Sequence, residues 1–511
     1  MELKKNCLDA FEVLGTMMLT QEETAETIVP DYCPDIARVI RTEGKVYIHS
    51  RQILDGKAEV GGTVRVNVLY TPDGESGLRT LEFSIPFTAE SEKGSFSMCR
   101  ILTAEADLAA LETRTLNPRK VMTRCKLITR MSGYRKQQLS FGMDVSAEER
   151  LAIQKKQMKQ SVVLLTGISE KDFSFTDEFG ISGGRDGAAE LLSWSIYPEV
   201  TDSKPVGNRM ICKGSIHLGL LYRDVGGSCC FTETEMPFSQ VLDMEEQAEN
   251  AVTDVRIQLT GADLQISGED PSGRQISVTL YLHATALLYQ EQEITLLEDL
   301  YSTIYAVSYG ASPMELTAQR EVLQRRQSAR EILEIGIAAE SILALSVRCG
   351  AVSIGKDGKK TTVLRTPATI HALYLDEGGS VLFAERTTEI TCHMELPENC
   401  ALTAEAISAG EIQGSIGDRG IEVRFQVDFR ICMERKVQRV CISDIRLDSD
   451  RLKDTAAAPS LVLRCLDRHE TLWDIAKQYH TTIRDILAAN QAEHESDIPF
   501  DQLLLIPKKR A

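Results

Sequence analysis

The most regular feature of the chain is a strict alternation of apolar and polar residues in its C-terminal third. From Ile421 to Ile431 every odd-numbered residue is apolar and every even-numbered residue is polar. Because successive side chains of a strand point to opposite faces, this pattern predicts a long strand with one buried face and one solvated face. The same spacing returns at 276–282 and, more weakly, at 121–127. A solvated face is typical of antiparallel sheets, so we expect a mainly β fold.

A second pattern is repetition over a long interval. Three apolar segments end in Tyr70, Tyr222 and Tyr374, which lie 152 residues apart, twice, and a glycine follows four residues after each tyrosine. We therefore predict three copies of one antiparallel β-sandwich or barrel-like module. The predicted borders of the three copies are 1–158, 159–305 and 306–455.

The segments between the copies are polar. Residues 147–160 and 312–328 are interpreted as short polar helices or linkers, and Ser312-Pro-Met-Glu315 has the spacing of a helix capping box. Residues 448–460 end in an alanine-rich stretch with a proline, which predicts a tether.

The C-terminal segment 459–511 has a different pattern. A short apolar run at 461–466 predicts a strand, and Leu472, Ile475, Ala476 and Tyr479 fall on one face of a helix. Thr482 can cap a second helix with the same spacing, and 503–506 predicts a strand that Pro507 ends. The expected order is β-α-α-β.

Composition narrows the class of partner. The 511 residues carry a net charge of −18, which argues against a nucleic acid partner because phosphates require a basic surface. The thirteen cysteines are scattered without a C-x-x-C pair, which indicates a reducing compartment. No signal peptide is recognisable and no apolar run has the length of a membrane span, so we expect a cytoplasmic protein.

Two short motifs invite a chemical interpretation, and both favour ordinary strand residues. The run Gly350–Lys356 has a phosphate-loop spacing, but Asp357 stands where a Ser or Thr should hold Mg²⁺. Cys392-His393 and Cys400 lack the second close ligand pair of a zinc site. No catalytic constellation stands out, so we predict no catalytic residue, no metal and no cofactor, and a protein that is not an enzyme.

The tail combines several motifs of a known family. They are Glu470-Thr-Leu-Trp-Asp-Ile-Ala476, Thr481-Thr-Ile483, the helix-ending Asn490 and the Pro499-Phe-Asp-Gln502 turn. Together they resemble a LysM domain. The resemblance implies binding of N-acetylglucosamine chains of peptidoglycan or chitin through the loops that flank the helices. Both loops lack the family's usual glycines, and side chains there hinder close approach of a sugar. The predicted ligand- or partner-binding residues are Arg468, His469, Glu470, Thr471, Trp473, Lys477, Pro499, Phe500, Asp501 and Gln502.

Trp473 is a special case within this set. Helical geometry places its ring beside the apolar stripe, with Lys477 on the same side. Two interpretations stay open, a rim residue that completes the small core and a partly exposed aromatic anchor for a partner.

The upstream copies contain further sequence motifs, among them Pro34-Asp-Ile36 in the first copy and Lys204-Pro-Val-Gly207 in the second. With the triplication and the LysM-like tail, these resemble the SPOCS-domain proteins of spore-forming Firmicutes, which include the SipL-type spore coat morphogenesis proteins. The third copy lacks both motifs and is the most divergent of the three copies.

This resemblance implies a non-enzymatic adaptor of spore coat assembly. Its partner would be a SpoIVA-type coat ATPase on the forespore surface, in the mother-cell cytoplasm. Two other hypotheses compete with it, a peptidoglycan-binding protein of the cell wall or spore cortex and an envelope hydrolase targeted by its LysM domain. The hydrolase is the weakest of the three, since no catalytic motif is found.

Overall fold

The computed structural model describes residues 1–511 with short gaps, and almost every described segment is a β-strand. Residues outside the description are 75–76, 182–185, 246–250, 268–271, 358–360, 398–399, 419, 453–460, 466–469, 499–502 and 508–511. The prediction of a mainly β fold with antiparallel sheets is confirmed.

The first repeat, residues 2–146, is a sandwich of two three-stranded antiparallel sheets. One sheet has the order β1-β6-β5 and the other the order β2-β3-β4. Valines of β3 and the buried face of β6 fill the space between the sheets. The strands are β1 (Glu2–Ile28), β2 (Ile36–Leu54), β3 (Lys57–Pro72), β4 (Arg79–Glu90), β5 (Ile101–Asn117) and β6 (Lys120–Ser146).

The second repeat, residues 153–302, has the same plan, with sheets β11-β12-β7 and β10-β9-β8. Tyr70 and Tyr222 occupy equivalent places in the first two repeats. Tyr70 donates to the carbonyl of Pro34 at 3.2 Å, and Tyr222 donates to that of Asp186 at 3.5 Å. The strands are β7 (Ile153–Gly180), β8 (Ala188–Val206), β9 (Arg209–Asp224), β10 (Cys229–Asp243), β11 (Val252–Ile266) and β12 (Gln275–Ser302).

The third repeat, residues 305–452, differs in one strand. Its first sheet has the order β13-β19-β18, but in its second sheet β14 and β15 pair in succession along one edge of β16, while β17 pairs along the other. The strands are β13 (Tyr305–Leu333), β14 (Ala339–Cys349), β15 (Ser353–Asp357), β16 (Thr361–Asp376), β17 (Val381–Glu395), β18 (Cys400–Gly417) and β19 (Gly420–Leu452). That each repeat folds independently, within the predicted domain borders, remains a prediction.

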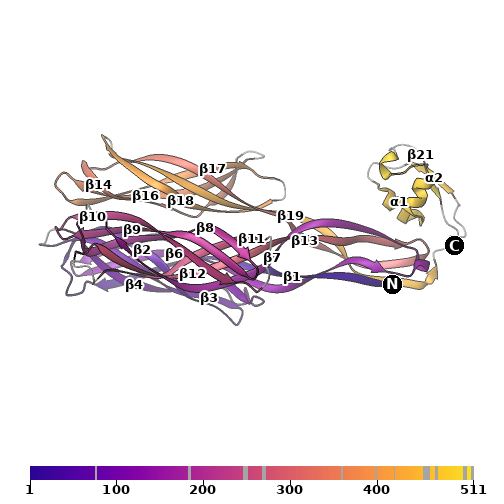
Figure 1. Cartoon of the computed structure of the whole chain (residues 1–511), viewed down its shortest axis with the longest axis horizontal. Coiled ribbons are helices and arrows are strands. Elements are labelled where there is room, and N and C mark those ends of the chain that lie inside the picture. Colours follow the sequence, from indigo (N-terminus) through magenta and orange to yellow (C-terminus); the bar gives the residue numbers. More distant parts are fainter. Residues whose placement is uncertain are drawn as a thin grey trace.

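The first and last strands of each repeat extend well beyond its sandwich as a two-stranded ribbon. The three ribbons pack together into one stalk, which leads away from the sandwiches (Figure 1). Each repeat contributes to the apolar core of the stalk, as Phe141, Leu296 and Cys441 illustrate. The packing is close, because a Cβ on Gly142 would lie 2.4 Å from the carbonyl oxygen of Ile442.

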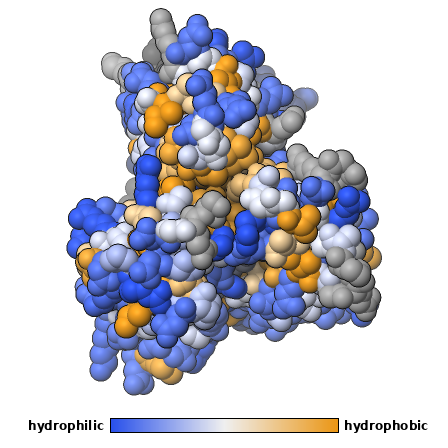
Figure 2. Space-filling view, turned by 90° about the vertical axis from the view of Figure 1, so that its left-hand side faces the viewer, coloured by the Kyte–Doolittle hydropathy of each residue, from blue (hydrophilic) through white to orange (hydrophobic). Residues whose placement is uncertain are grey.

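At the opposite end the sandwiches form three lobes around a common centre, where apolar side chains are visible between them (Figure 2). Leu69, Leu221 and Leu373 meet in this central cluster, and each immediately precedes a repeat tyrosine. The three repeats are therefore packed side by side around one long axis.

The prediction of short polar helices or linkers between the repeats is wrong, because most of these residues belong to β13 and β7. The predicted capping box at Ser312 lies inside β13, where Pro313 stands opposite Val440 of β19. Leu316 is buried in the stalk core, so burial in the stalk outweighs the local helix signal. Residues 147–160 contain only a 3₁₀ turn, Glu149–Leu151, before β7 begins. Most of the predicted tether, 453–460, lies outside the described residues.

The tail, residues 461–507, has the predicted order of elements. β20 (Leu461–Cys465) pairs antiparallel with β21 (Leu503–Pro507), and α1 (Leu472–Tyr479) and α2 (Ile483–Ala489) lie between them. Thr471 and Thr482 cap the two helices. The side chain of Asn490 donates to the carbonyls of Ile486 and Leu505, both at 2.7 Å, and so ties α2 to β21.

Candidate binding site of the C-terminal tail

The tail lies at the far end of the stalk from the sandwiches and packs on it through α1 (Figure 1). The ring of Trp473 meets that of Tyr301 edge to face, with centroids 5.0 Å apart and an interplanar angle of 69°. This geometry is favourable for two aromatic rings. The Tyr301 hydroxyl also donates to the carbonyl of Thr481 at 2.8 Å. Trp473 is only 8% exposed, so its ring is largely covered by the same chain.

Asp299 is the polar centre of this contact. Its carboxylate accepts hydrogen bonds from the Trp473 indole at 2.7 Å, the Lys477 ammonium at 2.6 and 2.8 Å and the Tyr309 hydroxyl at 2.6 Å. Lys477 donates to the Tyr309 hydroxyl as well, at 3.0 Å. We call Asp299, Tyr301 and Tyr309 the tail-binding site of the stalk. It combines a buried aromatic contact with a charge-assisted network.

A local irregularity of the stalk precedes Asp299. In the pairing of β12 with β7, Leu297 stands opposite Gln157 and Asp299 opposite Lys156, so Glu298 is an extra residue. Such a bulge changes the direction in which neighbouring side chains point. We infer that the bulge helps to aim Asp299 at the tail.

The charges of the contact are stable at neutral pH. Burial alone would raise the pKa of Asp299, but the hydrogen bonds from Lys477, Trp473 and Tyr309 outweigh it and hold that pKa below its usual value. Burial would lower the pKa of Lys477, and the bonds to Asp299 and Tyr309 raise it instead. A carboxylate with a depressed pKa stabilises the folded contact at neutral pH, and this stabilisation is lost as the pH falls through the lowered pKa.

The structure describes four of the ten predicted tail residues. Trp473 and Lys477 lie on the same side of α1, facing Asp299. Thr471 caps α1 and accepts a bond from the amide of Asp474. Glu470 pairs with Arg464 at 2.5 Å. Arg468, His469, Pro499, Phe500, Asp501 and Gln502 lie outside the described residues.

The tail-binding site of the stalk was not predicted from the sequence. Trp473 and Asp299 are 174 positions apart, and no local pattern connects them. The sequence offers one sign of this site: Asp299 follows the apolar end of a strand, and tyrosines lie close by at positions 301 and 309. Such a signal is too common to single out this position.

The other motifs considered in the sequence are strand residues. Lys356 of the phosphate-loop-like run belongs to β15, where it stands opposite Thr362. Cys392 and His393 are adjacent in β17, so their side chains point to opposite faces. Among the described residues no three His, Cys, Asp or Glu side chains are grouped as a metal site would require. No helix in the described part of the chain is both long and apolar enough to cross a membrane.

Comparison with known families agrees with this architecture. The SPOCS domain model of SipL matches residues 35–109 and 188–267, the corresponding parts of the first two repeats, and neither match covers the third repeat. The LysM domain model matches residues 468–507. No curated protein and no solved structure matches the chain. Both matched families are binding or adaptor domains, and LysM is a peptidoglycan-binding module. The chain therefore contains two regions that match the SPOCS domain of SipL and a C-terminal region that matches the LysM domain, a combination that suggests a sporulation protein.

Proposed function

We propose that this protein is a non-enzymatic adaptor of spore coat assembly whose LysM tail docks onto a coat protein, a SpoIVA-type ATPase. The proposed place of action is the forespore surface, in the mother-cell cytoplasm. The three repeats would hold the tail at the end of a stiff stalk, remote from the sandwich lobes (Figure 1).

The observation that supports this proposal most strongly is that Trp473 and Lys477 lie together on one face of α1. Trp473 and Lys477 already make a protein contact, formed by an aromatic ring pair and a charged hydrogen bond. Buried aromatic residues and paired charges are the groups that dominate protein interfaces. A partner that offered a ring and a carboxylate could replace Tyr301 and Asp299 on the same face.

It follows that the stalk and the partner compete for the tail. A partner that uses Trp473 binds only those molecules in which the tail has left the stalk, so its apparent affinity is reduced by the fraction released. The loop residues Glu470 and Thr471 need no such release, since their hydrogen bonds among the described residues are to Arg464 and Asp474 of the tail itself.

A second candidate function is peptidoglycan binding, which the LysM match over both loops favours. The predicted residues for it are those of the loops, namely Arg468, His469, Glu470 and Thr471 together with Pro499, Phe500, Asp501 and Gln502. This function would not require Trp473 to leave the stalk.

The test compares the affinity of three full-length variants for the purified coat ATPase with that of the parent protein. Trp473→Ala should weaken binding by about thirtyfold, the equivalent of about 2 kcal/mol, because it removes the anchor. Asp299→Ala should strengthen binding by about threefold or more, because it releases the tail. Glu298→Ala is the matched control, since the one ion pair of this neighbouring carboxylate among the described residues is a long one, 3.9 Å to Lys156.

Release of the tail can be followed on the same proteins. Cys7 in the stalk and Cys465 in β20 are the two exposed cysteines among the described residues, so both accept spin labels. Asp299→Ala should broaden the distance distribution between the labels, and Glu298→Ala should leave it unchanged. If Asp299→Ala broadens this distribution without changing the affinity for the ATPase, the partner does not use the Trp473 face.

A further inference from the structure

A cleft runs between the first and second repeats, far from the tail. It consists of two adjoining cavities of about 560 and 430 Å³, which share Arg65, Glu82 and Asp263. These volumes lie within the range of about 300 to 1,000 Å³ that is usual for ligand sites. One wall is formed by β3 and β4 of the first repeat, and the other by β8 and β11 of the second.

The charged groups of the cleft are largely compensated by one another. Arg65 pairs with Glu82 at 2.8 Å, and Glu190 pairs with Arg223 at 2.5 Å. Lys45 lies 3.4 Å above the ring centre of Trp194, which lines the larger cavity. Because most of these charges are paired, the cleft offers many polar atoms and a limited net field, which includes the carboxylate of Asp263, unpaired within the described residues. This favours a neutral polar ligand over a strongly charged one.

Two groups in the smaller cavity have unused hydrogen-bonding capacity. Tyr47 is 5% exposed, and its hydroxyl has no hydrogen-bond partner among the described residues. An unpaired buried hydroxyl is costly, so it suggests a partner that the chain does not supply. Within the described part of the chain the Asp263 carboxylate likewise makes no hydrogen bond or ion pair, and it interacts with Arg65 and Tyr47 only through its charge. Together they offer a hydroxyl and a carboxylate to a ligand.

Each cavity also has an exposed aromatic ring. Tyr32 lines the larger cavity and is 88% exposed, while Tyr281 lines the smaller one and is 47% exposed. An exposed ring offers a flat apolar surface with a polar tip. The cleft therefore provides two ring surfaces and, between them, the polar groups Arg65, Glu82 and Asp263.

We propose that this cleft binds a neutral, extended saccharide chain. The apolar faces of sugar rings would stack on Tyr32 and Tyr281, and the sugar hydroxyls would bond to Asp263, to the Tyr47 hydroxyl and to the Arg65–Glu82 pair. A saccharide supplies both donors and acceptors without net charge, as the lining requires. The proposal is independent of the tail, because every residue in it belongs to the first two repeats.

The two tryptophans of the chain make a selective test possible. In a full-length Trp473→Phe protein, Trp194 is the single remaining tryptophan and lines the cleft, so its fluorescence reports the cleft and not the LysM domain. Titration with cellohexaose and with chitohexaose should give a saturable change for at least one of them. Tyr281→Ala and Asp263→Ala should each weaken that binding at least tenfold, and Tyr47→Phe, which removes only the hydroxyl, about threefold.

Tyr197→Ala is the matched control, since Tyr197 is a tyrosine of the second repeat that is 42% exposed and lines neither cavity. It should bind like the parent protein. The proposal is overturned if neither hexasaccharide changes the Trp194 signal at millimolar concentration. It is also overturned if the cleft variants bind normally, or if only a hexalysine peptide gives a response, which would identify a site for basic peptides.

Discussion

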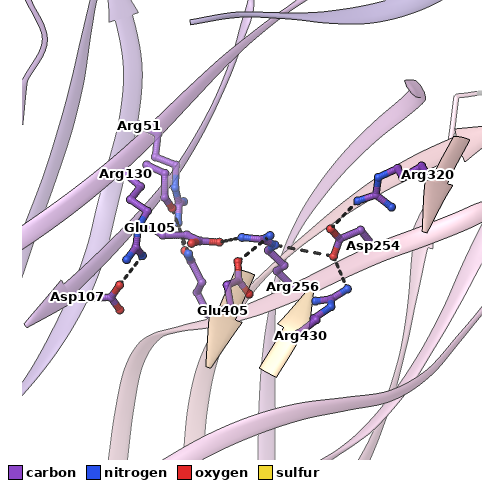
Figure 3. A network of polar contacts seen from close by, with 11 residues as sticks. Arg51, Glu105, Asp107, Arg130, Asp254, Arg256, Arg320, Glu405 and Arg430 are labelled. Atoms are coloured by element: carbon purple, nitrogen blue, oxygen red, sulfur yellow. Dashed lines mark hydrogen bonds and ion pairs between the residues drawn. The ribbon is translucent and has the colours of Figure 1, made fainter. Parts of the chain in front are cut away.

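Asp254→Ala should destabilise the assembly of the three repeats by about 3 to 5 kcal/mol, because it removes the shared partner of several buried or partly buried arginines. Asp254 is 5% exposed and lies on β11 of the second repeat, against arginines of the third. Its carboxylate faces Arg430 at 2.7 Å, Arg320 at 3.5 Å and Arg256 at 3.8 Å (Figure 3). Alanine would leave these guanidinium groups near one another without their shared anion.

The same network joins all three repeats. Arg256 pairs with Glu105 of the first repeat at 2.5 Å and with Glu405 of the third at 2.9 Å (Figure 3). Burial would lower the pKa of Arg256, but Glu105, Glu405 and Asp254 hold it above its usual value. Loss of Asp254 should therefore loosen the contacts between repeats as well as lower the stability.

Differential scanning calorimetry measures this effect. Asp254→Ala should lower the melting temperature by about 5 °C or more. Asp107→Ala is the control, because Asp107 has a single, more exposed ion pair with Arg130 and should shift the melting temperature by about 1 °C at most. Equal small shifts for both variants would show that the network does not hold the repeats together.

Leu472→Ala should unfold the tail while leaving the repeats intact. Leu472 is 3% exposed and packs in the small core with Ile475, Ile486 and Ile506. Removing such a side chain costs about 2 to 5 kcal/mol, which is a large share of the stability of a domain this small. Amide hydrogen exchange should show loss of protection in α1, α2, β20 and β21, with β1 to β19 unchanged.

Leu463→Ala is the matched control for this variant. Leu463 lies in β20, but it is 59% exposed, so its removal creates no cavity. Protection in the tail should then stay at the level of the parent protein. If Leu472→Ala kept full protection as well, the proposed core of the tail would be wrong.

The elements that could be predicted from the sequence are those with a regular local pattern. The alternation at 421–431 identifies a strand because every second side chain there enters one core, and Phe425, Val427 and Phe429 are indeed buried. The tail was predictable for the same reason, since Leu472, Ile475 and Ala476 recur at helical spacing and are buried together.

The elements that could not be predicted depend on contacts between distant segments. Ser312 and Glu315 have helix-capping spacing, yet they lie in β13 because Leu316 joins a stalk core built by all three repeats. The role of Asp299 depends in the same way on a tail 174 positions away. In both cases the contacting residues are too far apart in the sequence to be seen in one short segment.

Binding measured with and without the tail is the most direct test of whether the LysM tail binds a coat protein. The full-length chain and a chain ending at residue 452 are each captured on the immobilised SpoIVA-type ATPase and sedimented with insoluble peptidoglycan. Circular dichroism confirms that the shortened chain keeps its sheets. We expect that the full-length chain binds the ATPase, that the shortened chain loses this binding, and that neither sediments with peptidoglycan. Undiminished ATPase binding by the shortened chain, or sedimentation of the full-length chain with peptidoglycan at micromolar affinity without ATPase binding, would contradict it.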